Sequence, residues 1–385
     1  MPIYNGNIHS KLPKTGTTIF TVMSKMANEH KAINLSQGFP DFSCSKKLLS
    51  LVTKHMKMGH NQYCPLQGVQ ELREAISEKI EKMYSTKYDP ETEINITAGA
   101  TQAIYTAITA LIREGDEVIV LEPAYDCYVP AIELNGGIPI YVQLKGTDFH
   151  VDWEEVKKVI SQRTKMIILC TPHNPSGGIM NANDMQKLEK LIRGTDIIIL
   201  SDEVYEHIIF DGYEHQSVAR FPQLVNRCVI VYSFGKTFHA TGWKLGYCVA
   251  PENIMKEFRK VHQWVVFTVN TPMQYAIAEY LKDENNYLGL YDFYQEKRDY
   301  FIELIKGSKF KVIPASGSYF QLLDYSEITD EKDTEYAIRL TKDFGIASIP
   351  MSVFYHKPID NKRLRFCFAK EKETLEKAAE KLCKI

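Results

Sequence analysis

The sequence predicts an α/β fold in which a large domain is built on a seven-stranded, mostly parallel sheet and a smaller α+β domain packs beside it. Between about residues 94 and 250, short apolar runs rich in β-branched residues alternate with longer segments of helical periodicity, as is typical of layered α/β proteins. Several runs are apolar at nearly every position, which indicates strands buried on both faces. After residue 307 the pattern changes to short strands, a glycine-containing turn and two helices, which indicates the second domain.

Each element follows from a local pattern of apolar residues. The strands expected in the large sheet are the apolar runs at 94–97, 117–121, 139–144, 164–170, 196–201, 228–233 and 245–250. Helical spacing predicts helices at 70–83, 101–113 and 183–192, and the stretch 251–306 carries no strand pattern. The smaller domain is expected to contain strands at 310–313, 319–324 and 364–369, a turn at 316–318, and helices at 334–344 and 372–384.

The length of the chain agrees with more than one domain. At roughly 150 residues per domain, 385 residues correspond to two or three. We expect residues 1–45 to form an N-terminal arm and part of the small domain, residues 46–290 to form the large domain, and residues 291–385 to form the small C-terminal domain.

Composition excludes several functional classes. With 46 Lys and Arg against 48 Asp and Glu, the net charge is -2, and no basic run is present, so a nucleic-acid partner is not expected. No apolar stretch approaches the roughly 20 residues of a membrane span, and no signal peptide is visible. The eight cysteines are scattered without a C-x-x-C pair, which favours reduced thiols in a cytoplasmic protein, and the histidines show no metal-binding spacing, so no metal is expected.

Polar residues follow three of the buried strands at the edge where α/β proteins bind ligands. They include Asn174 in TPHNPSG, Asp202 and Tyr205 in SDEVYEH, and Ser233 and Lys236 in SFGKTF. A carboxylate directly after an apolar strand requires a cationic partner, although capping of a helix is about equally common. A lysine in such a place can lose its proton and form a Schiff base, although a lone lysine more often lies on the surface.

A further segment, TAGATQ at 97–102, combines a strand end, a glycine turn and a helix start. Backbone N–H groups at such a helix start can bind a phosphate, and capping without a ligand is equally common. No G-x-G-x-x-G or P-loop motif is present, which disfavours dinucleotides and nucleoside triphosphates. A phosphate site, a carboxylate for a ring nitrogen, a phenol and a Schiff-base lysine are together what pyridoxal 5'-phosphate requires.

Eight motifs in order, SQGFPDF, NQYCPLQG, TAGATQAI, EPAYDCY, TPHNPSG, SDEVYEH, SFGKTFHATGWKLGY and RLRFCFAK, resemble those of class I, fold-type I aminotransferases. SQGFPDF and EPAYDCY resemble the kynurenine aminotransferase and glutamine transaminase K subgroup. The stretches GTTIFTVMS, FTVNTPMQ and PMSVF resemble bacterial methionine aminotransferases. The resemblance implies a homodimer with shared active sites that moves an amino group between an L-amino acid and a 2-oxo acid by a ping-pong mechanism.

The resemblance also implies roles for individual residues toward the cofactor. Lys236 would form the Schiff base and then shuttle a proton, Asp202 would hold the pyridinium N–H, and Tyr205 would bind the phenolic oxygen together with Asn174. Tyr125 would stack on the ring. The cofactor phosphate would be bound by Gly99, Ala100, Thr101, Ser233, Lys244 and Tyr63 of the partner subunit. Lys244 stands where many relatives carry arginine, so we expect a single point-charge contact there.

For the substrate, the resemblance implies that Arg365 clamps the carboxylate, with Arg363 as the nearby competitor, and that the backbone of Gly38 donates to the same group. Asn174 is also expected to contact the substrate. The side-chain pocket would be formed by Ile19 and Phe20 from the N-terminal arm, by Tyr319, and by Tyr63 and Phe267 from the partner subunit. The segment 263–272 contains no arginine, which disfavours dicarboxylic donors and favours methionine, glutamine, aromatic amino acids or kynurenine.

Two other functions stay open at this point. The same catalytic groups could eliminate a leaving group from Cβ of cysteine conjugates, and the sequence does not separate this β-lyase activity from transamination. A cofactor-binding regulator without catalysis is also conceivable. Regulators of that kind usually carry a DNA-binding extension, and this sequence starts directly with the aminotransferase-like arm.

Overall fold

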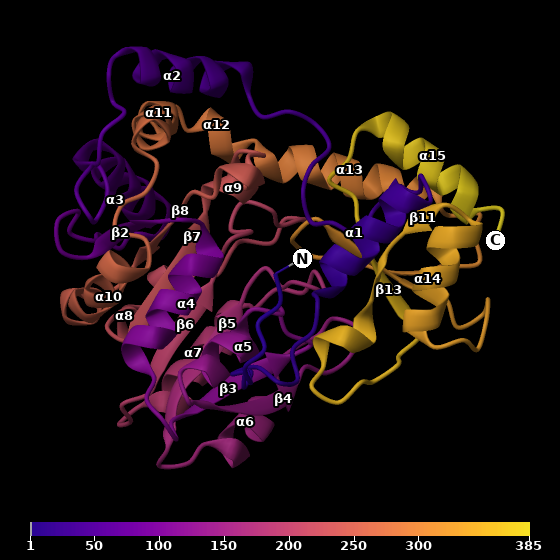
Figure 1. Ribbon diagram of the computed structural model, residues 1–385, viewed down its shortest axis with the longest axis horizontal. Helices are drawn as coiled ribbons and strands as arrows, with labels where there is room; N and C mark the ends of the chain where they lie inside the picture. The colour runs from indigo at the N-terminus through magenta and orange to yellow at the C-terminus, as the bar shows by residue number, and fades with distance from the viewer. Residues whose placement is uncertain (1) are drawn as a thin grey trace.

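The computed structural model describes residues 2–385 and shows a large body beside a smaller one (Figure 1). The described residues form a seven-stranded sheet in the large body with the order β2-β8-β7-β6-β5-β3-β4. Its strands are β2 (Ile94–Thr97), β3 (Glu117–Glu122), β4 (Ile138–Gln143), β5 (Thr164–Cys170), β6 (Ile198–Asp202), β7 (Cys228–Ser233) and β8 (Gly246–Val249). Strand β8 runs opposite to the other six strands of this sheet, so the predicted α/β fold with a mostly parallel sheet is confirmed.

The strands alternate their side chains between two apolar layers, as the period of two along a strand requires. Val118 and Val120 of β3 face one layer, whereas Ile119 and Leu121 face the other. The first layer is covered by α4 (Ala100–Leu111), α5 (Tyr128–Leu134) and α10 (Glu252–Val265). The opposite layer is covered by α3 (Gln70–Tyr84), α6 (Trp153–Val159), α7 (Ala182–Ile192) and α11 (Thr271–Leu281).

The edges of the sheet differ from its centre. Every residue of β3 is buried, whereas β4 at the edge has mostly half-buried residues and contains Pro139, a residue that edge strands tolerate. The stretch 251–306 is helical as predicted, with α12 (Asn285–Leu288) and α13 (Leu290–Leu304) following α10 and α11. The remaining short helices of the large body are α8 (Pro222–Val225) and α9 (Phe234–Thr237), and α2 (Lys46–Lys57) lies against α11.

The smaller body is built on an antiparallel sheet with the order β12-β13-β10-β9. Its strands are β9 (Lys311–Ile313), β10 (Phe320–Asp324), β12 (Ile349–Pro350) and β13 (Arg363–Cys367), and its helices α14 (Asp333–Asp343) and α15 (Lys372–Leu382) lie near the predicted ranges. A pair of two-residue strands, β1 (Ile33–Asn34) and β11 (Ile346–Ala347), joins the N-terminal part of the chain to this body.

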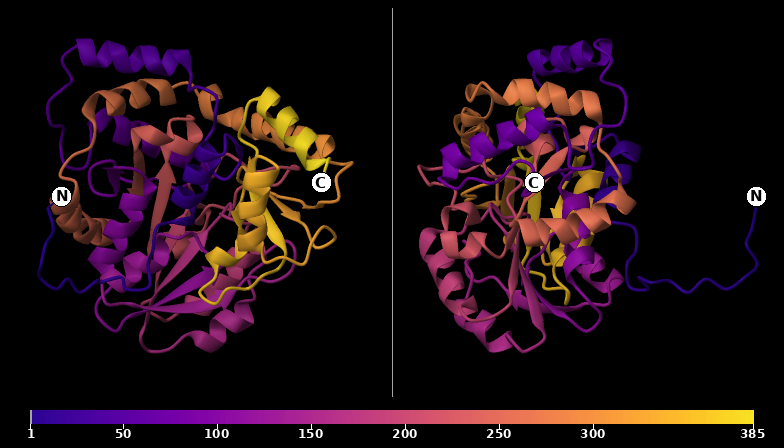
Figure 2. Two further views of the ribbon diagram at one scale, coloured as in Figure 1. Left: turned by 45° about the vertical axis from the view of Figure 1, so that its right-hand side comes forward. Right: turned by 90° about the vertical axis from the view of Figure 1, so that its left-hand side faces the viewer.

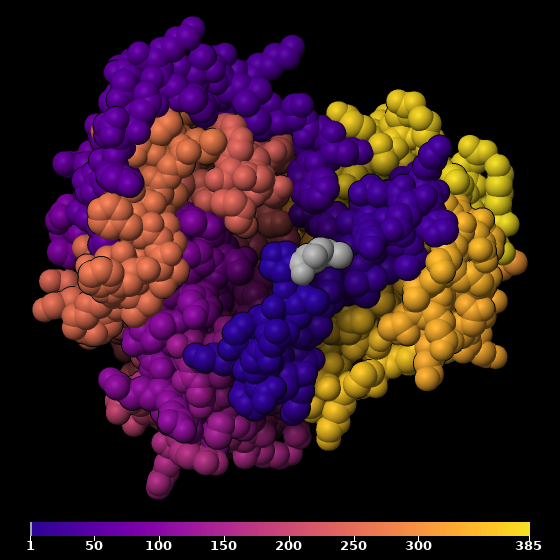
Figure 3. All heavy atoms as spheres, viewed as in Figure 1, coloured from indigo at the N-terminus to yellow at the C-terminus, as the bar shows by residue number. Residues whose placement is uncertain are grey.

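Helix α1 (Ile19–Glu29) also packs on the smaller body, beside α14 and β11. Figure 3 shows the N-terminal part of the chain lying across the boundary between the two bodies on the face turned to the viewer. The described residues at the N-terminal end, from Pro2 on, extend away from the bulk of the molecule (Figure 2). The predicted division at residues 45 and 290 stays a prediction. No helix within residues 2–385 is both long and apolar enough to cross a membrane.

Candidate active site

The carboxyl ends of β5, β6 and β7 and the start of α4 enclose a cavity, which we call the sheet-edge cavity. Ten of the predicted cofactor-binding residues line it: Gly99, Ala100, Thr101, Tyr125, Asn174, Asp202, Tyr205, Ser233, Lys236 and Lys244. A second cavity, the arginine cavity, is lined by Phe20, Thr21, Gln37, Gly38, Tyr125, Asn174, Tyr205, Lys236, Phe320 and Arg365. Because four residues line both cavities, the two adjoin one another.

The start of α4 provides one end of the sheet-edge cavity. Gly99 precedes the helix with φ +81°, a conformation that residues with a Cβ adopt only with strain. A Cβ placed on Gly99 would lie 3.5 Å from the Cε and Nζ atoms of Lys244. The lysine ammonium therefore lies beside the free N–H groups of the helix start, and together they make a site for an anion.

Asp202 is the last residue of β6, and its side chain is buried. Burial raises the pKa of this carboxyl to about 6, while bonds from the Tyr128 hydroxyl and the Val204 N–H oppose the rise. The Tyr128 hydroxyl donates to Oδ2 at 2.7 Å, and the Val204 N–H lies 3.4 Å from Oδ1. Asp202 is therefore mostly ionised at neutral pH, and its charge favours a cationic ligand group in the cavity.

Lys236 lies in α9, directly after β7, and its side chain reaches both cavities. Its Nζ donates to the carbonyl of Gly38 and to the hydroxyl oxygen of Tyr319, at 2.9 Å in both cases. Burial lowers the pKa of Lys236 to about 8. An appreciable fraction of the amine is thus neutral near pH 7, which a nucleophile or a base requires.

Arg365 on β13 is fully buried at the wall of the arginine cavity. Its Nη1 donates to Asn174 Oδ1 at 2.7 Å and its Nη2 to the Ser36 carbonyl at 2.9 Å, while the guanidinium lies 3.9 Å from the centre of the Phe320 ring. Burial lowers its pKa to about 10, so the charge remains at neutral pH. Within residues 2–385 its buried Nε has no hydrogen-bond partner.

The competitor Arg363 lies two residues earlier on the same strand and does not line the arginine cavity. Its guanidinium lies 5.6 Å from the centre of the Phe149 ring. Ile19, another predicted substrate residue, begins α1 and packs against the core without lining either cavity.

Tyr63 and Phe267 also lie outside both cavities of this chain. Their rings pack edge to face with centroids 5.3 Å apart, and their exposed fractions are 82% and 51%. Two aromatic side chains are thus held together at the surface, where a single chain gives them little burial. Their predicted contacts across a subunit boundary stay a prediction.

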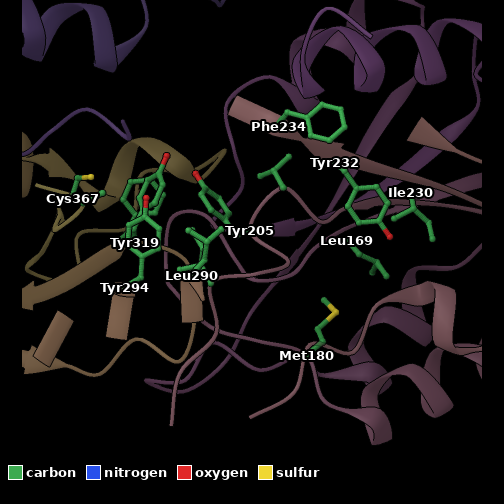
Figure 4. Close-up of a cluster of buried hydrophobic side chains, with 14 of the residues drawn as sticks. Leu169, Met180, Tyr205, Ile230, Tyr232, Phe234, Leu290, Tyr294, Tyr319 and Cys367 are labelled. Atoms are coloured by element: carbon green, nitrogen blue, oxygen red, sulfur yellow. The ribbon is translucent and has the colours of Figure 1, made fainter. Parts of the chain in front are cut away.

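Tyr319 is fully buried, and its hydroxyl contacts Lys236 while its ring stays outside the lining of both cavities. Figure 4 shows Tyr319 beside Tyr205 and Tyr294.

Sequence reasoning missed Phe320, which stacks on Arg365, and Tyr128, which binds Asp202. Tyr128 is the last residue of the motif EPAYDCY, so its place in that motif was the available signal.

No cluster of three or more His, Cys, Asp or Glu side chains suited to a metal ion occurs in the part of the chain that the structure describes. The chemistry of the two cavities is instead that of an amine, a buried carboxylate, an anion site and a buried guanidinium. This combination suits a ligand with a phosphate and a cationic ring, together with a second ligand that carries a carboxylate.

Comparisons with known proteins agree with this chemistry. The sequence profile of the family "Aminotransferase class I and II" matches residues 30–382. Methionine aminotransferase of Escherichia coli strain K12 is 50% identical over 374 residues, covering 97% of both chains, and kynurenine–oxoglutarate transaminase 1 of Rattus norvegicus is 32% identical, covering 95% of both. A crystal structure from Escherichia coli with a methionine aminotransferase function superposes with a TM-score of 0.96 at 48% identity, covering 100% of both chains.

Proposed function

Because the chain belongs to the family of class I and II aminotransferases, we propose that it transfers the amino group of an L-amino acid with an uncharged side chain to a 2-oxo acid. We propose a ping-pong mechanism in which the two substrates use the same site in turn. Methionine is the first donor to test, since the chain is similar over nearly its whole length to a methionine aminotransferase. Kynurenine comes next, because a kynurenine transaminase is a more distant relative. Glutamine and aromatic amino acids are the further donors with uncharged side chains.

We propose pyridoxal 5'-phosphate as the cofactor, and the lining of the sheet-edge cavity fits it. The Gly99 turn and Lys244 suit the phosphate, Asp202 suits the ring nitrogen, and Lys236 suits the carbonyl carbon. Ser233, Ala100 and Thr101 line the same cavity, beside the start of α4. When bound, this cofactor supplies an electron sink that stabilises negative charge on the substrate Cα.

The residues around the ring have separate tasks in this proposal. Asp202, kept ionised by the Tyr128 hydroxyl, holds a proton on the ring nitrogen. Tyr205 and Asn174 would donate to the phenolic oxygen, and Tyr125, which lines both cavities, would stack against the ring. Asn174 also accepts from Arg365, so its amide orientation is fixed with its NH₂ group free for the cofactor.

Lys236 and Arg365 act on the substrate. Arg365 binds the carboxylate through its guanidinium, which lines the arginine cavity and keeps its charge at neutral pH. Lys236 as a neutral amine takes the proton from Cα and returns it in the next step. The single observation that carries the proposal is the convergence of Lys236, Asp202 and Arg365 on two adjoining cavities.

The preference for uncharged donors rests on the lining of the arginine cavity and on the sequence. Phe20 and Tyr125 face the cavity, and their rings lie 6.5 Å apart. The segment 263–272, proposed to reach the site from a second chain, contains no arginine that could pair with a distal carboxylate. A second carboxylate would then be buried without a partner, which disfavours aspartate and glutamate as donors.

We propose that two chains form a homodimer in which Tyr63 and Phe267 complete the partner's site. Support comes from their exposure and from Trp264, another aromatic residue of the same region, whose exposed fraction is 84%. Mixing inactive Lys236→Ala and Tyr63→Ala chains tests this directly. Shared sites would restore activity to a fraction of the dimers, whereas unshared sites would leave the mixture as inactive as its components.

The experiment that tests the function is a spectral screen of half-reactions. The protein is loaded with pyridoxal 5'-phosphate, and each amino acid in turn is added while the cofactor absorbance is followed. We expect conversion with methionine and aromatic amino acids and little with aspartate. Absence of conversion with every donor would overturn the proposal and favour a non-catalytic cofactor-binding protein.

A variant pair identifies the lysine. Borohydride should fix the cofactor covalently on the peptide that contains Lys236, and Lys236→Ala should lose both this adduct and turnover. Lys190→Ala removes an exposed lysine of α7 and serves as the control, in which both should persist. An unchanged adduct in Lys236→Ala would show that another lysine binds the cofactor.

A further inference from the structure

The Lys236 amine, the Gly38 carbonyl and the Tyr319 hydroxyl form a closed triangle of hydrogen bonds. Lys236 Nζ donates to the Gly38 carbonyl and to the Tyr319 hydroxyl oxygen, each at 2.9 Å. The Tyr319 hydroxyl in turn donates its proton to the same Gly38 carbonyl. Because that proton is engaged, the phenol presents only lone pairs to Lys236, and it acts toward the amine as an acceptor.

The bond to Cε and the two hydrogen bonds fix three of the four tetrahedral directions of the nitrogen, and they therefore fix the direction of the fourth, remaining position. A neutral amine carries two N–H groups and one lone pair, and both N–H groups are used by Gly38 and Tyr319. The lone pair is therefore left over and can take a proton. In the ammonium form the third N–H occupies that same position, so a proton accepted there is also returned from there.

We propose that Tyr319 is a positioning residue, which together with the Gly38 carbonyl holds the free amine of Lys236 and turns its remaining position toward the substrate Cα. The proposal rests on the transaminase function proposed above. Lys236 Nζ gains one proton when the Cα–H bond breaks, the electron pair stays with the substrate, and the same nitrogen later gives the proton back. Tyr319 neither gains nor loses a proton.

The surroundings of Tyr319 suit a fixed acceptor. Its side chain is fully buried, and its ring contacts those of Tyr205, Phe320 and Tyr294 at centroid distances of 5.0, 5.0 and 5.8 Å. Its carbonyl accepts at 3.1 Å from the N–H of Phe368, the residue directly after β13, the strand that carries Arg365. The amine and the guanidinium that binds the carboxylate are therefore positioned by the same part of the fold.

The Tyr319→Phe variant removes the acceptor and keeps the ring. In the loaded enzyme we expect kcat with methionine to fall about tenfold or more, since positioned proton transfer contributes roughly 10²–10⁴-fold, while KM stays within threefold. The isotope effect with α-deuterated methionine should rise, because proton transfer then limits the rate more strongly. A merely structural role would not raise this isotope effect.

A second readout needs no cofactor. In the apoprotein, the pH dependence of labelling by trinitrobenzenesulfonate at Lys236, followed by mass spectrometry, reports the pKa of the amine. Loss of an acceptor disfavours the ammonium, so the labelling midpoint should move to lower pH in Tyr319→Phe. The other ionisable groups that act on this amine are Cys367, Lys244, Arg365 and Asp202, and the variant leaves them unchanged.

Tyr294→Phe is the matched control. Tyr294 is equally buried, and its hydroxyl has no hydrogen-bond partner among residues 2–385, so its loss should change neither kcat nor the labelling curve. If kcat and the labelling curve are also unchanged in folded Tyr319→Phe, the proposal is wrong. If that variant fails to fold, 3-fluorotyrosine at position 319, a weaker acceptor of the same shape, should give smaller shifts in the same directions, and unchanged readouts would again overturn it. Should the wild-type protein transaminate no donor, the proposed function fails, while the apoprotein labelling still decides whether Tyr319 holds Lys236.

Discussion

Replacing Arg365 by lysine keeps a cation in the arginine cavity and removes the planar fork. The guanidinium is held by Asn174 at 2.7 Å and by the Ser36 carbonyl at 2.9 Å, and it stacks on Phe320 at 3.9 Å. A lysine ammonium cannot reproduce these contacts and also present two parallel donors to a carboxylate. The variant should therefore bind the substrate carboxylate with one bond in place of two.

The size of the effect follows from the lost bond. A hydrogen bond to a charged group is worth about 1.5–3 kcal/mol, and the fully buried site places it near the upper value. At about 1.4 kcal/mol per factor of ten, a loss of about 3 kcal/mol lowers kcat/KM for methionine roughly 100- to 200-fold. Binding of pyridoxal 5'-phosphate should change little, because Arg365 does not line the sheet-edge cavity.

The assay compares methionine with 3-(methylthio)propylamine, which has the same side chain and no carboxylate. The wild-type enzyme should prefer methionine strongly, and Arg365→Lys should reduce that preference while leaving the rate with the amine nearly unchanged. Arg363→Lys is the control, because that guanidinium lies over Phe149. If Arg365→Lys stays within threefold of wild type while Arg363→Lys loses the preference, Arg363 binds the carboxylate and the assignment of Arg365 is wrong.

Lys79 and Glu206 form a buried ion pair at 2.6 Å, and Glu206→Gln leaves the lysine without its counter-charge. The variant should therefore lower the free energy of unfolding at pH 7 by about 3–5 kcal/mol, measured by urea titration. A loss below about 1 kcal/mol would contradict this. Burial alone would raise the pKa of Glu206, but Lys79 lowers it well below its usual range, so the stabilisation is complete above about pH 4.3 and declines at lower pH. Thermal melts of wild type and Glu206→Gln should therefore converge below that pH, and parallel curves would refute the linkage. Lys244→Ala should raise the Kd for pyridoxal 5'-phosphate about tenfold through loss of one charged contact. Lys244→Arg keeps the charge and should leave the Kd unchanged; equilibrium dialysis measures both. Asp202→Asn should lower kcat at least 100-fold by removing the charge opposite the ring nitrogen; a kcat close to wild type in stopped-flow half-reactions would exclude that role.

The strands of the large sheet were predictable because each contains a short run of apolar, often β-branched residues, and several of these runs are apolar on both faces. Three of the predicted ranges, 94–97, 164–170 and 228–233, coincide with the observed strands. The two-residue strands β1, β11 and β12 carry no such pattern, because they are defined only by the neighbours they meet in the folded chain. Their existence depends on tertiary contacts that a local pattern does not contain.

The same distinction applies to the cavities. Asn174, Asp202 and Lys236 were predictable as polar residues at the ends of apolar strands, and resemblance to a known family supplied their roles. Tyr128 and Phe320 were not predictable in this way, since Tyr128 lies 74 residues from Asp202 and Phe320 lies on a different sheet from the strand ends. Contacts of this kind join elements that the sequence separates widely.

The charge of the cavities also differs from that of the chain. The chain has a net charge of -2, whereas Lys236, Lys244 and Arg365 outnumber Asp202 around the two adjoining cavities. Burial lowers the pKa of Lys236, and the charges of Lys244 and Arg365 lower it further. A phosphate beside Lys244 and a carboxylate beside Arg365 would offset these charges, so each anionic ligand should favour the ammonium form of Lys236. In the proposed reaction, the substrate carboxylate and the cofactor phosphate would thus help to set the proton balance of Lys236, the amine proposed to move the Cα proton.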